Sequence, residues 1–257
     1  MKKKFGQNFL INKNIVYDII KEANINKNSI IYEIGPGNGV LTEQIVKSNP
    51  EKFIAIEIDC SLKDKLDKYF FDKRYELIFG DALKFNEINF FKNKVTIISN
   101  LPYNISVKLL IKWIFIQAEF GLFKEMILMF QKEVAERIVA KVNTKKYGRI
   151  TLLTTAIFDV IKFKDVSKDN FFPRPKVDSI VLKFTPHKKT HLNKNELFNL
   201  EKISMKLFSN RRKKIKKNLL TLLNNEYIDT SKYSKLFNLR PENINREDYF
   251  ALAKLIK

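Results

Sequence analysis

The chain of 257 residues is long enough for one sizeable domain and a small second one, and its 45% hydrophobic content is sufficient to fill a core. Its 48 Lys and Arg residues outnumber 28 Asp and Glu residues, and the resulting formal charge of +20 indicates a polyanionic partner. The single cysteine, Cys60, excludes an intramolecular disulfide framework and a zinc site built from cysteines.

The charge favours a nucleic acid as the partner, although RNA, DNA and an anionic membrane would all attract it. The basic start, residues 1–6, lacks the apolar run of a signal peptide, and no later segment approaches about 18 uninterrupted apolar residues. We therefore expect a cytoplasmic protein that does not insert into a membrane. Cys60 is expected to be buried, and His187 and His191, in a Lys-rich stretch, are expected to be solvated, so no metal site is predicted.

Short β-branched runs alternate with longer helical patterns through the first two thirds of the chain. The runs predicted as buried strands cover residues 29–34, 53–58, 76–79, 95–99 and 126–130. This alternation is typical of a parallel, doubly wound α/β sheet, whose ligand crevice lies beyond the carboxyl ends of the strands. Each motif described next follows one of these runs.

The first strand runs into a glycine loop, with Gly35, Gly37 and Gly39, and then into a helical pattern over residues 40–46. Glycines let the backbone pass close under a ligand where a Cβ would collide. The GxGxG spacing differs from the GxGxxG of dinucleotide binders, whose helix N-terminus holds a pyrophosphate. The spacing therefore suits a nucleotide without a pyrophosphate, although a glycine loop alone is equally compatible with a simple tight turn.

Two acidic residues follow the next strands. Glu57 ends the second strand about 20 residues beyond the glycine loop, where a carboxylate can accept hydrogen bonds from both ribose hydroxyls. Asp81 follows Gly80 after the third strand, where its carboxylate would meet an adenine amino group, although Asp after Gly is also ordinary turn chemistry. The pattern indicates a nucleoside-containing cofactor.

The motif Asn100-Leu101-Pro102-Tyr103 directly follows the fourth strand. The exocyclic amine of adenine is a poor nucleophile, and two acceptors, the Asn100 side-chain oxygen and the Leu101 carbonyl, would aim its lone pair. Pro102 fixes the backbone, and Tyr103 offers an aromatic face to an extruded base. The alternative is a proline-containing strand exit with a tyrosine in the core.

Residues 149–163 fit either a strand or a helix that hands over to a strand near Phe158. After Pro186 a polar connector, residues 187–195, leads to two helical patterns, so we expect a first domain of residues 1–186 and a helical second domain of residues 187–257. The apolar positions of these two patterns are Leu197, Leu200, Ile203 and Leu207, and then Leu219, Leu220 and Leu223.

Two basic segments are candidates for phosphate contacts. Residues 211–217 are predicted to place cations around most of a helix, and residues 145–149 are predicted to form a turn that reaches the same RNA backbone. A plain solvated surface is the alternative for both. The candidate RNA-binding residues are Arg211, Arg212, Lys213, Lys214, Lys146 and Arg149.

Taken in chain order, several stretches resemble the KsgA family of small-subunit (16S-type) rRNA adenine N6,N6-dimethyltransferases. The matching stretches are KFGQNFL at 4–10, EIGPG at 33–37, NLPYNIS at 100–106, QKEVAER at 131–137, YGR at 147–149 and FFPRPKVDS at 171–179, with weaker matches in FSNRRK at 208–213 and RPEN at 240–243.

The resemblance implies a Rossmann-like, seven-stranded methyltransferase sheet with a small all-helical C-terminal domain. It implies transfer of methyl groups from S-adenosyl-L-methionine to the N6 amines of two adjacent adenines, which become dimethylated. These adenines would lie in a 3′-end hairpin loop of small-subunit rRNA, and the protein would act as a monomer on the small subunit or its precursor during ribosome assembly. The resemblance assigns cofactor contacts to Asn8, Leu10, Gly35, Glu57, Asp81 and Asn100, and it places Phe171 near the target base, opposite Tyr103.

Three other functions fit parts of the sequence. An Erm-type methyltransferase of large-subunit rRNA would share the glycine loop, but residues 131–137 and 171–179 favour the KsgA family. An RNA-binding assembly factor without turnover would not need Glu57, Asp81 and the motif at 100–103. A nicotinamide-dependent dehydrogenase is disfavoured by the GxGxG spacing.

Overall fold

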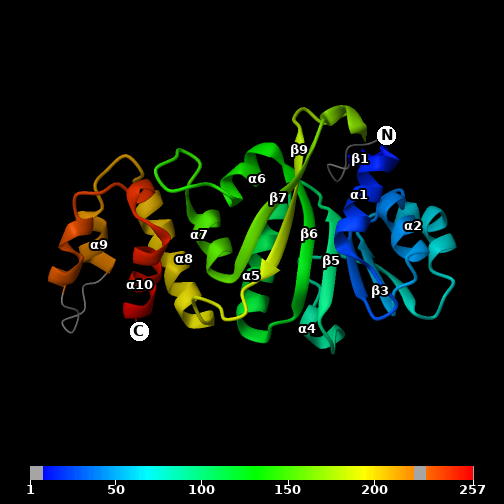
Figure 1. The fold of residues 1–257 in the computed structure, drawn as a ribbon, viewed down its shortest axis with the longest axis horizontal. Helices are drawn as coiled ribbons and strands as arrows, with labels where there is room; N and C mark the ends of the chain where they lie inside the picture. The colour runs from blue at the N-terminus through cyan, green and yellow to red at the C-terminus, as the bar shows by residue number, and fades with distance from the viewer. Residues whose placement is uncertain (1–7, 223–229, 257) are drawn as a thin grey trace.

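The computed structural model describes residues 8–222 and 230–256, and its centre is a seven-stranded sheet in the order β4-β3-β2-β5-β6-β9-β7 (Figure 1). The strands are β1 Phe9–Leu10, β2 Ile30–Ile34, β3 Lys52–Glu57, β4 Tyr75–Phe79, β5 Val95–Asn100, β6 Phe123–Gln131, β7 Phe158–Val166, β8 Phe171–Phe172 and β9 Ser179–Pro186. The helices are α1 Lys13–Ala23, α2 Val40–Lys47, α3 Lys63–Leu66, α4 Glu87–Phe90, α5 Ser106–Phe120, α6 Lys132–Ile138, α7 Arg149–Ile157, α8 Lys194–Phe208, α9 Lys216–Leu222 and α10 Arg246–Leu255.

The five strands expected from the apolar runs are all present and mutually parallel, as β2 to β6. β9 inserts antiparallel between β6 and β7, which completes the seven strands implied by the family resemblance. The order reverses at β2, which has β3 on one side and β5 on the other. A crevice is expected at such a reversal, beyond the carboxyl ends of the strands.

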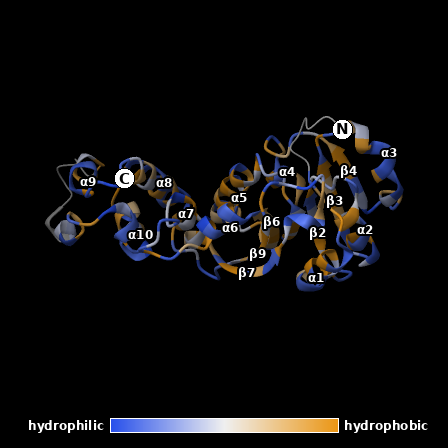
Figure 2. Ribbon diagram, turned by 90° about the horizontal axis from the view of Figure 1, so that it is seen from above, coloured by the Kyte–Doolittle hydropathy of each residue, from blue (hydrophilic) through white to orange (hydrophobic). Residues whose placement is uncertain are grey.

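The central strands β2, β3, β5 and β6 are buried on both faces over most of their length, which explains why they are apolar at most positions rather than at alternate ones. Neighbouring residues of a strand point to opposite faces, so Ile97 joins one apolar cluster with α5 and α7, while Ile98 joins the other with α1 and α2. Figure 2 shows hydrophobic residues concentrated along the strands, whereas the helices carry both hydrophobic and hydrophilic stretches.

The described residues after Pro186 form only helices and turns, and Figure 1 shows α8, α9 and α10 beyond the β7 edge of the sheet. The last strand ends at Pro186, and the division into two domains at this residue stays a prediction. The helices nevertheless share one apolar cluster with the sheet: Leu197 and Leu207 of α8 and Tyr249 of α10 belong to the same cluster as Leu152 of α7 and Leu128 of β6. Leu223, the last apolar position of the second helical pattern, lies outside the described residues.

The ambiguous segment 149–163 is a helix followed by a strand. α7 ends at Ile157 and β7 begins at Phe158, as in the second of the two alternatives.

The prediction of one helix over residues 211–217 is wrong for its first part. Helix α8 ends at Phe208, and Ser209 donates its hydroxyl hydrogen bond to the Lys206 carbonyl. A turn follows, in which the backbone N–H of Lys213 donates to the Asn210 carbonyl, and helix α9 begins only at Lys216. Ser and Asn satisfy backbone groups locally and so favour a helix end over its continuation.

A second, two-stranded sheet joins distant parts of the chain. Strand β1 pairs antiparallel with β8, with Phe9 opposite Phe172 and Leu10 opposite Phe171. The backbone N–H of Ile11 donates to the Asn170 carbonyl and extends this pairing. This two-stranded sheet holds the start of the described chain next to the carboxyl end of the main sheet (Figure 1).

Candidate functional site

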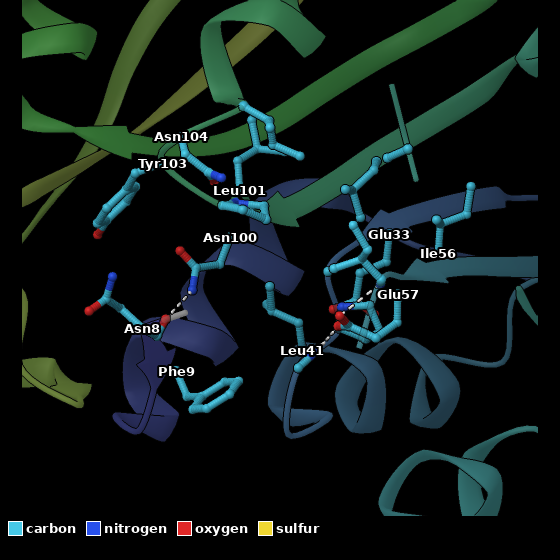
Figure 3. Close-up of a pocket in the computed structure, with 18 of the residues that line it drawn as sticks. Asn8, Phe9, Glu33, Leu41, Ile56, Glu57, Asn100, Leu101, Tyr103 and Asn104 are labelled. Carbon is cyan, nitrogen blue, oxygen red and sulfur yellow. Dashed lines mark hydrogen bonds between the residues drawn. The ribbon is translucent and has the colours of Figure 1, made fainter. Parts of the chain in front are cut away.

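A cavity of about 190 Å³ lies at the carboxyl ends of β2 to β5, at the reversal of strand order (Figure 3). All six residues expected to contact the cofactor line it, and so do the four residues of the Asn-Leu-Pro-Tyr motif. These lining residues are Asn8, Leu10, Gly35, Glu57, Asp81, Asn100, Leu101, Pro102 and Tyr103. The rest of the first matching stretch, residues 4–7, lies outside the described residues.

A side chain at either of two glycines of the loop after β2 would crowd a neighbouring residue. Gly35 has φ +65°, and a Cβ there would lie 3.3 Å from Cγ of Pro102. Gly37 has φ +59°, and a Cβ there would lie 2.7 Å from the Phe9 ring. Positive φ values strain residues that carry a Cβ. The loop therefore passes tightly between Pro102 and strand β1, and its residues line the cavity.

Glu57 ends β3 with its carboxylate only 2% exposed and held by three backbone N–H groups. Oε2 accepts from Gly37 at 3.1 Å, and Oε1 accepts from Ile58 and Asp59 at 2.9 Å each. Burial raises the pKa of Glu57, and the three hydrogen bonds oppose that rise by stabilising the ionised form. A carboxylate has more acceptor sites than these three bonds use, so Glu57 can still accept from a ligand.

Glu33 is a buried acid in the wall of the cavity to which the sequence analysis assigned no role. It is 1% exposed, and its Oε2 accepts a hydrogen bond from the Thr42 hydroxyl at 2.7 Å. Burial raises its pKa to about 8, with the Thr42 bond acting against the rise and the nearby Glu57 charge adding to it. The signal that identifies Glu33 is a carboxylate inside an otherwise apolar strand buried on both faces.

The part of the cavity wall formed by residues 81–83 is anchored to helix α5. The Asp81 carboxylate accepts from the N–H of Leu83 at 2.9 Å. Lys112 of α5 donates to the carbonyls of Ala82, at 3.0 Å, and Phe85, at 2.5 Å, and pairs at 2.7 Å with the fully buried Glu87. Local sequence patterns did not predict this anchor, because it joins residues that are 27 and 30 positions apart in the chain.

Asn100 is oriented by the start of the chain. Its side-chain N–H donates to the Asn8 carbonyl at 3.0 Å, so its side-chain oxygen points away from Asn8, on the side of Tyr103 (Figure 3). The preceding Ser99 donates its hydroxyl to the Ile34 carbonyl at 2.6 Å and fixes the end of β5 against the end of β2. Both bonds hold the Asn100 oxygen in one position before any substrate arrives.

Tyr103 lies at the cavity with its hydroxyl 2.7 Å from the Ser179 hydroxyl of β9. Burial raises the pKa of Tyr103, and the Ser179 bond partly offsets the rise. The phenol is therefore neutral and held in place, with its ring available along the cavity.

Phe171 does not line the cavity that Tyr103 lines. It is 3% exposed and belongs to the apolar cluster that contains Leu10 and Val16. The pairing of β1 with β8 explains this placement, because paired residues of antiparallel strands share a face and Leu10 and Phe171 both point into the core. Its neighbour Phe172 is 61% exposed and stands opposite Phe9, which does line the cavity.

The candidate RNA-binding cations fall into two groups. Four have partners within the protein. Three of these pair with carboxylates: Arg211 with Glu242 at 3.5 Å, Lys146 with Glu136 at 2.5 Å, and Arg149 with Glu201 at 2.7 Å. Arg211 also donates to the Thr144 carbonyl at 3.1 Å, and Lys214 donates to the Asn238 side chain at 3.2 Å. Within residues 8–222 and 230–256, the exposed side chains of Arg212 and Lys213 have no such partner, which leaves them available to phosphates.

Two expectations about isolated residues are wrong. Cys60 is exposed, because it lies at the start of a short 3₁₀ turn, Cys60–Leu62, on the surface. His187 is half-buried and contacts the Thr155 carbonyl at 3.1 Å and Asp159 at 3.3 Å, so it is not solvated as expected. His191 is exposed as expected, although its ring stacks on Phe250 at 5.5 Å. In the part of the chain that the structure describes, no group of three or more His, Cys, Asp or Glu residues is placed to hold a metal ion, and no helix has the length and apolar character to span a membrane.

Comparisons with known proteins agree with this geometry. A family model described as "Ribosomal RNA adenine dimethylase" matches residues 1–257. "Ribosomal RNA small subunit methyltransferase A" of Pelagibacter ubique is 40% identical over 253 residues, covering 98% of this chain and 95% of the relative. The protein of the same name from Borreliella burgdorferi is 39% identical, covering 99% of this chain and 88% of the relative.

Two solved structures share the fold over nearly the whole chain. A dimethyladenosine transferase from Plasmodium falciparum superposes with a TM-score of 0.79 at 29% identity, covering 95% of each chain. The 23S rRNA methyltransferase ErmE superposes with a TM-score of 0.70 at 21% identity, covering 97% of this chain and 99% of that one. The likeness to ErmE shows a shared fold and nothing about the RNA that is modified.

Proposed function

The chain belongs to the ribosomal RNA adenine dimethylase family and is an S-adenosylmethionine-dependent rRNA adenine dimethyltransferase, and we propose that it modifies two adjacent adenines of small-subunit rRNA. The target would lie in a 3′-end hairpin loop, on the small subunit or its precursor during ribosome assembly. The names and coverage of the two curated relatives support the choice of subunit. We further propose that the protein acts as a monomer in the cytoplasm.

One observation carries the proposal: the residues expected to hold a nucleoside and the two groups expected to accept from an amine line the same cavity. The glycine loop can pass close to a ligand, because Gly35 and Gly37 pack tightly against Pro102 and Phe9, which also line the cavity. Glu57 would accept from the ribose hydroxyls, and Asp81 from the adenine amine of the cofactor. Asn8, Leu10 and Asn100 would complete the cofactor contacts.

The cofactor supplies an electrophilic methyl group attached to a sulfonium. The protein's part is to position the target amine in front of that methyl. The Asn100 oxygen and the Leu101 carbonyl would each accept a hydrogen bond from one N–H of the amine. These two hydrogen bonds would draw the nitrogen lone pair out of conjugation with the adenine ring. Because the Asn8 carbonyl already holds the Asn100 amide, little reorganisation is needed when charge develops on nitrogen.

Tyr103 would stack on the extruded adenine. Extrusion costs a few kcal/mol, and one stacked base returns about 1–3 kcal/mol, so one aromatic face offsets much of the cost. The Ser179 bond keeps the ring from turning away from the base. Phe171, which the family resemblance also places near the base, is buried in the apolar cluster that contains Leu10.

The decisive experiment maps labelled methyl groups on purified particles. Unmodified small-subunit and large-subunit particles are each incubated with the protein and labelled cofactor, and the modified nucleotides are located by digestion and mass spectrometry. We expect N6,N6-dimethyladenine in small-subunit rRNA alone. Methylation of large-subunit rRNA instead would favour the Erm-type alternative, and tight particle binding without methylation would favour an assembly factor that lacks turnover.

A further inference from the structure

A second groove, of about 340 Å³, lies beside the catalytic motif, where α6 begins next to the segment that precedes β9 (Figure 1). Three of its lining side chains are lysines, from three separate parts of the chain: Lys132 starts α6, Lys168 starts the short turn Lys168–Asn170, and Lys176 precedes β9. We propose that this groove binds the phosphate backbone of the RNA strand next to the adenine being methylated. The proposal extends the proposed function to a second contact with the same substrate.

The groove is connected to the catalytic site by direct contacts. Gln131, which lines it, pairs in the sheet with Ser179, and the Ser179 hydroxyl is the one that holds Tyr103. A strand that places its base on Tyr103 therefore has its neighbouring phosphates within reach of this groove. Consecutive phosphates are spaced regularly, so cations from separate segments can contact successive ones.

Asp178 fixes the backbone of two of the lysines. Its carbonyl accepts from the N–H of Lys132 at 2.9 Å, and its carboxylate accepts from the N–H of Lys168 at 3.0 Å. The carboxylate is thereby engaged with the backbone and not with a lysine side chain. The two lysines are thus held at a defined separation, while their ammonium groups stay free to meet a ligand.

The groove and the cations that pair with it carry a net charge of +2, from five cations (Lys132, Lys168, Lys176, Arg137 and Lys146) and three carboxylates (Glu133, Glu136 and Asp178). Its two glutamates are each engaged by a neighbouring cation: Glu133 pairs with Arg137, and Glu136 pairs with Lys146 at 2.5 Å. Among residues 8–222 and 230–256, no carboxylate pairs with the side chain of Lys132, Lys168 or Lys176. Three cations gathered in one groove without carboxylate partners repel one another, and a polyanion relieves that repulsion.

The Lys-rich composition of the chain gives an alternative, in which these residues are ordinary solvated lysines. The test is therefore a comparison between two triple variants. The first is Lys132→Gln, Lys168→Gln and Lys176→Gln. The matched control replaces Lys92, Lys94 and Lys124 by Gln, because these are exposed lysines at the opposite, amino end of β5 and β6.

Binding of a fluorescently labelled RNA hairpin with an adenine-containing single-stranded loop is measured by anisotropy over a range of KCl concentrations. Three contacts to single-stranded phosphates contribute about 0.7 each to the slope of log affinity against log salt. The groove variant should thus lose about 2 from the slope shown by the wild type, while the control keeps it. In methylation assays the groove variant should show a raised KM for RNA with kcat unchanged at saturating RNA.

Equal slopes and equal KM values for the two triple variants would overturn the inference. Unaltered cofactor affinity and circular dichroism of the groove variant establish that it is folded. If the wild type binds the hairpin but methylates no small-subunit particle, the proposed function fails, and the difference in salt slope between the variants still decides whether the groove binds RNA.

Discussion

Replacing Asn100 by Ala removes two interactions that affect different stages of the reaction. The first is the donated bond to the Asn8 carbonyl, which supports the ground-state structure and contributes about 0.5–1.5 kcal/mol. The second is the acceptor oxygen aimed at the target amine, whose contribution is concentrated in the transition state. By analogy with the loss of one preorganised polar group in an enzyme site, that second term is about 2.7–4 kcal/mol, or about 10²- to 10³-fold in rate.

The two terms can be separated by the conditions of the assay. Loss of the Asn8 contact loosens a residue that lines the cofactor cavity, and this appears as weaker cofactor binding. Single-turnover methylation of unmodified small-subunit particles at saturating S-adenosylmethionine removes that contribution and isolates the rate of the chemical step. Under these conditions Asn100→Ala should remain slower by about 10²-fold or more, with RNA affinity almost unchanged because phosphate contacts dominate it.

The matched control is Asn93→Ala, an exposed asparagine just before the amino end of the same strand, β5. It should methylate at the wild-type rate. If Asn100→Ala also reacted at nearly the wild-type rate under saturating cofactor, the acceptor role of Asn100 would be refuted, even though the family assignment would stand.

Four further outcomes are expected. Glu57→Ala should weaken S-adenosylmethionine binding in calorimetry without unfolding the protein, and unchanged affinity would remove Glu57 from the ribose site. Arg212→Gln with Lys213→Gln should lower the salt slope of RNA binding, and an unaltered slope would assign these two cations to a solvated turn. Tyr103→Phe keeps the stacking face and should be much milder in single-turnover rate than Tyr103→Ala, so equal defects would implicate the hydroxyl instead. The pKa of Glu33 is about 8 in the folded protein and 4.5 ordinarily, so between these pH values the folded state keeps a proton that the unfolded chain releases. The cofactor-free protein should therefore lose stability as the pH rises from 4.5 to 8. Glu33→Gln should remove that loss in thermal unfolding scans, and an identical pH profile in the variant would contradict it.

The cavity could be predicted from the sequence because its residues follow apolar runs. Parallel strands end at the same edge of a sheet, so Glu57, Asp81 and Asn100 meet although they are far apart in the chain. The strand boundaries also follow from local patterns, and the alternative of a helix handing over at Phe158 was visible in the spacing of its apolar residues.

What the sequence did not reveal depends on partners that are distant in the chain. The pairing of Leu10 with Phe171 joins segments about 160 residues apart, and no local periodicity specifies which aromatic of Phe171 and Phe172 faces the core. The helix predicted from residue 211 failed for a different reason: the cations suit a helix, but Ser209 and Asn210 end the preceding one.

The apolar cluster shared by the sheet and the C-terminal helices has a consequence for motion. Tilting α8 and α10 away from α7 would expose leucine and aromatic side chains to water, at a cost of about 25 cal/mol for each Å² uncovered. Packing on both sides of the polar connector between β9 and α8 therefore opposes bending at this connector. We expect the same packing to limit changes in the distance between the basic turn at Arg212 and the Asn100 oxygen, because Ile215 and Leu219, which follow that turn, belong to the shared cluster.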